Sequence, residues 1–143
     1  MTEFNLETAD RLRRAVGDIV RSIQETETTP GGQIEALGFL VRDGAQSIAE
    51  LARRRRIRHQ SMSGTVAELE ARGWVTRSPD PADRRSVVVA ATDAGTAAID
   101  ESRSSRSGTI LRAAEEGLTA EERAVLARVP ELFDKLGATI AAR

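Results

Sequence analysis

The chain has 143 residues, 40% of them apolar, and a net charge of −1, which are ordinary values for one globular domain. It has no cysteine and one histidine, which excludes disulfides and thiol chemistry and disfavours a histidine-built metal site or a Ser-His-Asp triad. No apolar run approaches the roughly 18 residues of a membrane span, and no secretory signal opens the chain. We therefore expect a cytoplasmic protein that does not contact the membrane and is not an enzyme, with no catalytic residues and no cofactor. A metal held by carboxylates alone stays open, although no loop supplies such ligands.

The charge is unevenly distributed along the chain. Between Ser47 and Arg85 nine arginines stand against five acidic residues, a local charge of +4, whereas the rest of the chain carries −5. A basic middle between acidic flanks indicates one anion-binding surface on an acidic body. A solvated charged face would leave the same pattern, so this feature is only suggestive by itself.

Two amphipathic helices are predicted in the first part of the chain. The first spans Leu6 to about Glu25, where apolar residues recur at helical spacing, and a turn-rich segment ending in Pro30–Gly32 follows it. The second runs from about Gln33 to Arg42 and is closed by Asp43–Gly44.

Two shorter helices are predicted next. Ser47 and Glu50 form the pattern of a capping box, which opens a helix that runs to about Arg54 or Arg55. Another helix is predicted from near His59 to Arg72, and Gly73 stands where a left-handed terminal residue belongs. Two short helices joined by a tight turn are typical of a helix-turn-helix.

A hairpin and two further helices complete the predicted elements. Residues 74–78 and 86–90 are β-prone, and the segment Pro79–Arg85 between them contains prolines that cannot lie inside a central strand. Thr92 and Asp93 then cap a helix from about Ala94 to Glu116. A second capping box, Thr119–Glu122, opens a final helix up to Ala142, in which Pro130 predicts a kink or break.

The helix from His59 has one apolar and one polar face. At 100° per residue, Met62, Val66 and Leu69 form an inward stripe. The opposite side, at the start of the helix, is small and able to form hydrogen bonds, as a helix that reads base edges in a major groove requires. The candidate base-reading residues are His59, Gln60, Ser61, Ser63 and Gly64. Gly64 costs the helix roughly 1 kcal/mol relative to alanine, so close approach to a ligand and mere tolerance on a surface are equally open.

Arginines surround this helix in the sequence. Those at the turn before it are candidates for phosphate contacts, although some of them could instead cover the core or pair with Glu50. They are Arg53, Arg54, Arg55, Arg56 and Arg58. At the hairpin tip, the Asp83 carboxylate could hold the guanidinium of Arg84 or Arg85 extended for insertion into a narrow minor groove.

The segment from Ser47 to Asp93 resembles the MarR family of bacterial transcriptional regulators. Its most specific part is the sequence DPADRR at Asp80–Arg85, followed by a β-prone run and the helix opening at Thr92–Gly95. Two positions depart from the pattern: family members often carry arginine where Gly64 stands and glycine where Arg56 stands. The base-reading contacts and the geometry of the turn could therefore differ from those of relatives.

The resemblance implies a mainly α fold with a small β-hairpin wing. One domain would span residues 1–143, with dimerisation helices at 1–30 and 94–143 around a winged helix-turn-helix at 31–93. It implies a homodimer that binds double-stranded DNA at a pseudo-palindromic operator, most often as a repressor, with Arg84 or Arg85 in the minor groove beside Asp83. It also implies a small phenolic or lipophilic effector that relieves repression.

The sequence disfavours two other classes of function. A winged-helix module that binds proteins and has lost DNA binding should lack the basic turn and the basic hairpin, yet both are present. A catalytic role lacks a nucleophile–base pair and a phosphate-binding loop. The missing cysteines exclude a thiol-oxidation sensor and, with the single histidine, disfavour a metal sensor.

Overall fold

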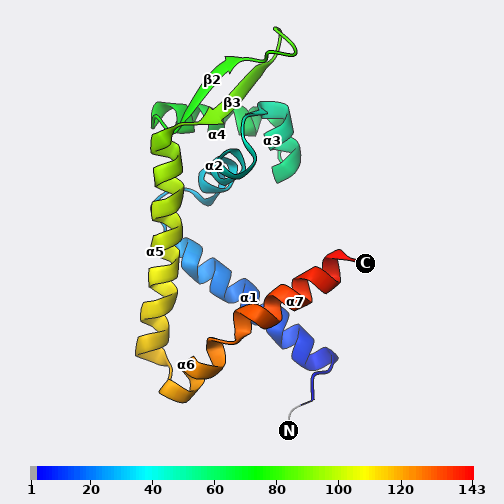
Figure 1. The fold of residues 1–143 in the computed structure, drawn as a ribbon, viewed down its shortest axis with the longest axis vertical. Helices are drawn as coiled ribbons and strands as arrows, with labels where there is room; N and C mark the ends of the chain where they lie inside the picture. The colour runs from blue at the N-terminus through cyan, green and yellow to red at the C-terminus, as the bar shows by residue number, and fades with distance from the viewer. Residues whose placement is uncertain (1–2) are drawn as a thin grey trace. The chain divides into compact units, whose positions relative to one another are not determined.

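The computed structural model describes residues 3–143, which divide into two compact units between Ser104 and Ser105. The first unit contains α1, α2, β1, α3, α4, β2, β3 and the start of α5 (Figure 1). The bounds of its elements are α1 Leu6–Glu25, α2 Gly31–Asp43, β1 Gln46–Ser47, α3 Ile48–Arg55, α4 His59–Ala71, β2 Val75–Pro79 and β3 Val87–Ala91. The predicted fold class, mainly helical with a small β wing, is confirmed.

The core of the first unit lies between the helices of the helix-turn-helix and the sheet. The predicted inward stripe of α4 is correct, because Met62, Val66 and Leu69 are all fully buried. They pack in one cluster with apolar residues of α2, α3, β2, β3 and α5: Ile34, Ala36, Leu37, Leu40, Leu51, Ala52, Val75, Val89 and Ile99. Each large side chain buried in this way stabilises the fold by about 1.5–3 kcal/mol.

The hairpin belongs to a three-stranded antiparallel sheet with the order β1-β3-β2. The sequence analysis did not predict β1, since two residues are too few to show a periodic pattern. It was also wrong to place Pro79 in the loop, because Pro79 is the last residue of β2 and is opposite Val87. A proline is tolerated there because β2 is an edge strand, where a missing amide hydrogen need not break a ladder bond.

Both helices of the helix-turn-helix end in a left-handed residue. At the end of α4 this residue is Gly73 (φ 76°), as predicted, and the Trp74 amide donates to the Leu69 carbonyl at 3.0 Å. At the end of α3 it is Arg56 (φ 54°), and the Ile57 amide donates to the Ala52 carbonyl at 3.0 Å. The turn before α4 therefore keeps the backbone of a glycine-terminated helix with an arginine in place of the glycine.

The start of α5 approaches the end of α4 very closely. The Thr92 hydroxyl donates to the Gly73 carbonyl at 2.7 Å, and the Thr92 amide donates to the Trp74 carbonyl at 2.9 Å. Thr92 also accepts from the Gly95 amide at 3.1 Å, which caps α5 as predicted. A Cβ at Gly95 would lie 2.1 Å from the Trp74 carbonyl oxygen, so only glycine fits there.

The second unit contains the rest of α5 (Asp93–Gly117), α6 (Ala120–Leu126) and α7 (Val129–Ala141). The predicted capping box is present: the Glu122 amide donates to the Thr119 hydroxyl at 3.2 Å, and the Thr119 amide donates to the Glu122 carboxylate at 2.8 Å. The predicted interruption near Pro130 is also confirmed, since α6 ends at Leu126 and Pro130 lies in the first turn of α7. In the range 3–143, no helix has the length and apolar character needed to cross a bilayer.

Candidate nucleic-acid interface

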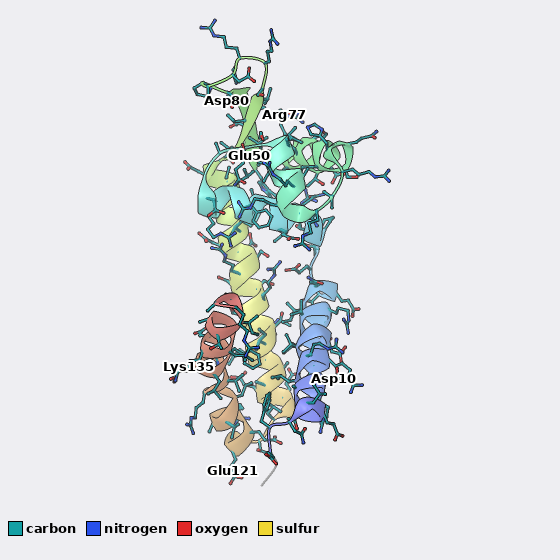
Figure 2. The ribbon with its side chains drawn as sticks, turned by 90° about the vertical axis from the view of Figure 1, so that its right-hand side faces the viewer. Asp10, Glu50, Arg77, Asp80, Glu121 and Lys135 are labelled. Carbon is teal, nitrogen blue, oxygen red and sulfur yellow. The ribbon has the colours of Figure 1, made fainter. Side chains whose placement is uncertain are left out.

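The candidate site is built on α3, α4 and the β2–β3 hairpin of the first unit. The hairpin projects from the helices of this unit (Figures 1 and 2). Ser47 starts α3 by accepting a bond from the Glu50 amide at 3.1 Å. The reciprocal bond of a capping box, from the Ser47 amide to the Glu50 carboxylate, does not occur among the described residues, so only half of the predicted box is formed. One capping bond of this kind is enough to start the helix.

The predicted base-reading face of α4 points to solvent at its start. His59, Gln60, Ser61 and Gly64 are exposed, whereas Ser63 is half-buried beside the apolar stripe. The buried stripe fixes the rotation of the helix, and thereby fixes which side chains face outward. The sequence thus placed four of the five residues on one accessible surface.

A polar contact that the sequence did not reveal also holds α4 in place. The buried Gln33 of α2 donates its side-chain amide to the Glu68 carboxylate on α4. Gln33 and Glu68 are 35 residues apart, so no local pattern in the sequence pairs them. The contact ties the start of α2 to the middle of the candidate recognition helix.

Gly64 is not required by the packing of the fold. A Cβ built at this position would meet no atom within 4 Å. The roughly 1 kcal/mol that a mid-helix glycine costs relative to alanine is therefore not offset by any close contact inside the described molecule. Packing inside the fold therefore does not explain Gly64, and both alternatives from the sequence, close approach to a ligand and tolerance on a surface, stay open.

The arginine run divides into two groups, and the first consists of Arg54 and Arg55. The Arg54 guanidinium lies 4.0 Å from the centroid of the Phe39 ring and donates to the Asp43 carboxylate at 2.7 Å and to the Gln46 side-chain oxygen at 3.0 Å. Arg55 donates to the Glu35 carboxylate at 3.1 Å, and its side chain is only 19% exposed. Both guanidinium groups are thus engaged inside the unit, joining α3 to α2.

These contacts have an electrostatic consequence for Asp43. The hydrogen bond from Arg54 lowers the pKa of the Asp43 carboxyl below its usual value; desolvation opposes this effect, and Arg42 adds to the lowering. Gln46 completes the cluster, since its buried amide donates to the backbone carbonyls of Phe39 and Gly44 at 3.2 and 3.3 Å. The cluster therefore stays ionised and bonded at neutral pH.

The second group consists of Arg53, Arg56 and Arg58, whose side chains are exposed. Within residues 3–143 no acidic side chain pairs with any of them. Arg53 lies in the last turn of α3, Arg56 forms the turn, and Arg58 precedes α4. Three cations are thus available at the edge of the candidate base-reading face, which is where phosphate contacts that position a recognition helix are expected.

At the hairpin tip, two aspartates organise the backbone. The Asp83 carboxylate accepts from the Arg85 amide at 3.0 Å and from the Ser86 hydroxyl at 3.3 Å, and the Asp80 carboxylate accepts from the Ala82 amide at 2.9 Å. The expected contact of Asp83 with a neighbouring guanidinium does not occur among the described residues. Asp83 instead shapes the turn that carries Arg84 and Arg85, both of which are exposed.

Two further arginines lie at the base of the hairpin. Arg77 on β2, labelled in Figure 2, pairs with Glu70 of α4 at 3.2 Å, and Arg72 lies 4.8 Å from the centroid of the Trp74 ring. Both belong to the basic segment of the sequence, where no local pattern predicts a role for them. They connect the end of α4 to the hairpin. In the part of the chain described here, no group of three or more carboxylate or histidine side chains could hold a metal ion.

Comparisons with known proteins match this region. A sequence profile of the MarR family matches residues 28–86, which include the helix-turn-helix and the hairpin tip. Residues 28–86 are thus similar to the MarR family.

Curated relatives include a helix-turn-helix transcriptional regulator of Mycobacterium tuberculosis, 36% identical over 74 residues, which are 52% of each chain. The repressor NicR of Pseudomonas putida is 42% identical over 57 residues, 40% of this chain and 36% of its own. The chain thus spans about half the length, or less, of these curated relatives.

A solved structure is similar over nearly the whole chain. BpsR of Bordetella bronchiseptica, whose DNA binding is regulated by 6-hydroxynicotinic acid, is 27% identical with a TM-score of 0.58. The match covers 94% of this chain and 97% of that one. The likeness therefore extends beyond the winged helix to the terminal helices of the chain.

Proposed function

We propose that this protein is a DNA-binding transcriptional regulator of the MarR family that acts in the bacterial cytoplasm as a homodimeric repressor of a pseudo-palindromic operator. The observation that carries the proposal is the exposed start of α4, where hydrogen-bonding side chains lie next to three arginines without acidic partners. The apolar stripe of the same helix is buried in the core, whereas this face is not used in packing.

Each part of the site has a separate task in this proposal. The start of α4 enters the major groove, where Gln60 and Ser61 donate to or accept from base edges. Arg53, Arg56 and Arg58 bind phosphates and set the position of the helix without reading sequence. Arg84 or Arg85 reaches an adjacent minor groove from the turn that Asp83 shapes. The structural arginines, Arg54 and Arg55, serve by keeping α2 and α3 together.

The proposed homodimer is supported by apolar side chains left uncovered on the terminal helices. No residue of α1 or α7 is buried, yet both helices carry large apolar residues. Those at least 37% exposed are Leu6, Val16, Ile19 and Val20 of α1, and Leu132, Phe133, Leu136 and Ile140 of α7. Helices of this kind are stabilised when a partner covers them, and a second copy of the chain supplies matching helices.

A small organic effector completes the proposal. The regulation of BpsR by 6-hydroxynicotinic acid is a property of that protein, and NicR is named a repressor. We infer that a small lipophilic or phenolic compound likewise regulates the DNA binding of this chain, and that its binding releases the chain from DNA.

The proposal is tested by selecting binding sites from a random-sequence duplex library with the full-length protein. Enrichment of a pseudo-palindrome with half-sites about one helical turn apart is the expected result. Gln60→Ala should then relax the preference at one base pair of each half-site, at about 1–3 kcal/mol for a bidentate contact. Absence of any enriched sequence, with binding to protein partners instead, would identify the chain as a winged-helix interaction module.

A further inference from the structure

Gly64 differs from Gly95 in what an added side chain would meet. At Gly95 an added Cβ would lie 2.1 Å from the Trp74 carbonyl oxygen, and at Gly32 it would lie 2.9 Å from the Arg55 guanidinium. The backbone contact accounts for Gly95, whereas the flexible Arg55 side chain can move away from a Cβ at Gly32. At Gly64 the space is open, and the residue is exposed in the first half of α4. A glycine there weakens the helix and gains nothing within the described chain.

The dimensions of the major groove give a reason for the absence of a side chain at Gly64. A helix with its side chains is about 10–12 Å across, and the groove is about 12 Å wide and about 8.5 Å deep. A helix that enters it therefore has almost no clearance, and each side chain on the leading face sets how deep the backbone can go. The neighbours of Gly64 one turn away are Gln60, Ser61, Ala67 and Glu68, all exposed. Ser61 and Ala67 have short side chains, so the helix backbone is little covered between them and Gly64.

We propose that Gly64 brings the backbone of α4 into contact with the DNA, and so sets the depth at which the helix lies and the specificity of binding. This inference rests on the proposed function. A deep position suits the residues present, because Ser61 has a short side chain that reaches a base edge only when the helix backbone is close. Gly64 acts as a specificity-determining residue through the absence of a side chain, without forming a side-chain bond itself.

The experiment compares Gly64→Ala with a matched control, Gly38→Ala, in the full-length protein. Gly38 also lies in the middle of a 13-residue helix of the same unit, and its added Cβ would meet Ile99 at an ordinary 3.9 Å. Both variants should raise Tm by about 2–4 °C, because alanine is the better helix former. Binding is measured by fluorescence anisotropy on two probes: the duplex that the wild-type protein enriches from a random library, and a scrambled duplex of the same length and composition.

Gly64→Ala should bind the enriched duplex about tenfold more weakly than wild type and the scrambled duplex equally well, because non-specific binding relies on phosphate contacts. Gly38→Ala should bind both duplexes like the wild type. Wild-type affinity of Gly64→Ala for the enriched duplex overturns the inference and leaves the proposed function standing, and so does an equal loss in both variants. A wild-type protein that enriches no duplex overturns the proposed function and the inference together.

Discussion

Single residues of this winged helix are under very different constraints, and the left-handed positions show this clearly. Gly73 and Arg56 end their helices with similar backbone angles, φ 76° and φ 54°. Glycine adopts this conformation freely, whereas a residue with a Cβ loses about 1–2 kcal/mol there. An arginine at such a position weakens the fold. In return, it places an exposed cation at the turn before α4.

Replacing Arg56 by glycine should therefore separate stability from DNA binding. We expect the free energy of unfolding to rise by about 1 kcal/mol, because the left-handed strain is removed. The salt dependence of DNA binding should fall by roughly two log units per log unit of salt, since each subunit of a dimer loses one phosphate contact. Urea denaturation and an anisotropy salt series measure the two effects. A variant with unchanged salt dependence would remove Arg56 from the phosphate-binding group.

Gly95 is constrained by packing, in contrast to Gly64. Gly95→Ala would place a Cβ 2.1 Å from the Trp74 carbonyl oxygen, a backbone atom that cannot rotate away. We expect a loss of at least about 2 kcal/mol in the free energy of unfolding, at the upper end of what overpacking costs. Thermal unfolding beside Gly38→Ala, where the Cβ is accommodated, checks this. Similar stability of the two variants would mean that α5 and the end of α4 lie farther apart than in this structure.

At the scale of elements, α2, α3 and α4 are joined by polar contacts between residues far apart in the sequence. Arg54 is bound to Asp43 and stacked on Phe39, Arg55 is bound to Glu35, and Gln33 is bound to Glu68. The arginines of one short run consequently fall into two groups: Arg54 and Arg55 are bonded within the fold, whereas the others are exposed.

Glutamine substitutions along the arginine run should distinguish the exposed arginines from those bonded within the fold. Arg53→Gln and Arg58→Gln should each lower the salt slope of DNA binding by roughly two in the dimer, with little change in stability. Arg54→Gln and Arg55→Gln should leave the slope nearly unchanged and should destabilise the fold, because they remove contacts between α3 and α2. Both quantities are measured for all four variants. The opposite assignment of slopes would show that the engaged arginines leave their partners on binding DNA.

The Arg54 cluster also predicts a dependence on pH. The pKa of Asp43 is lowered in the folded state, so its ionised form contributes stability above the usual carboxyl pKa, and this contribution is lost as pH falls through the lowered value. As the pH falls, the free energy of unfolding should therefore decrease more steeply for the wild type than for Asp43→Asn, which lacks the titrating group. Urea titrations across the acid range compare the two slopes. Parallel curves would indicate that Asp43 contributes nothing to the pH dependence.

At the scale of the whole molecule, the uncovered apolar residues of α1 and α7 require a partner surface. A charge on α7 should prevent the proposed dimer: we expect Phe133→Glu combined with Leu136→Glu to sediment as a monomer, because burying an unpaired carboxylate costs several kcal/mol. Lys135→Glu, at a highly exposed position of the same helix, is the control and should remain a dimer. A double variant that still dimerises would place the interface elsewhere.

The sequence by itself determined the helices, the hairpin and the inward stripe of α4. These follow from patterns within a few residues: the spacing of Met62, Val66 and Leu69, the capping box at Thr119–Glu122, the interruption at Pro130 and the glycine at position 73. Local patterns suffice because helix periodicity and termini depend on neighbouring residues. The exposure of His59, Gln60, Ser61 and Gly64 followed from the same periodicity.

Only the tertiary structure decided which arginines are engaged, what Asp83 contacts and why each glycine is present. Arg54 and Arg53 are adjacent in the sequence, yet one stacks on Phe39 of another helix and the other is exposed. Gly95 and Gly64 both lie within helices, yet one faces a carbonyl oxygen and the other faces open space. These differences depend on segments brought together by folding. No pattern within a short window contains them, because the partners lie many residues away and the packing of the core sets their distances.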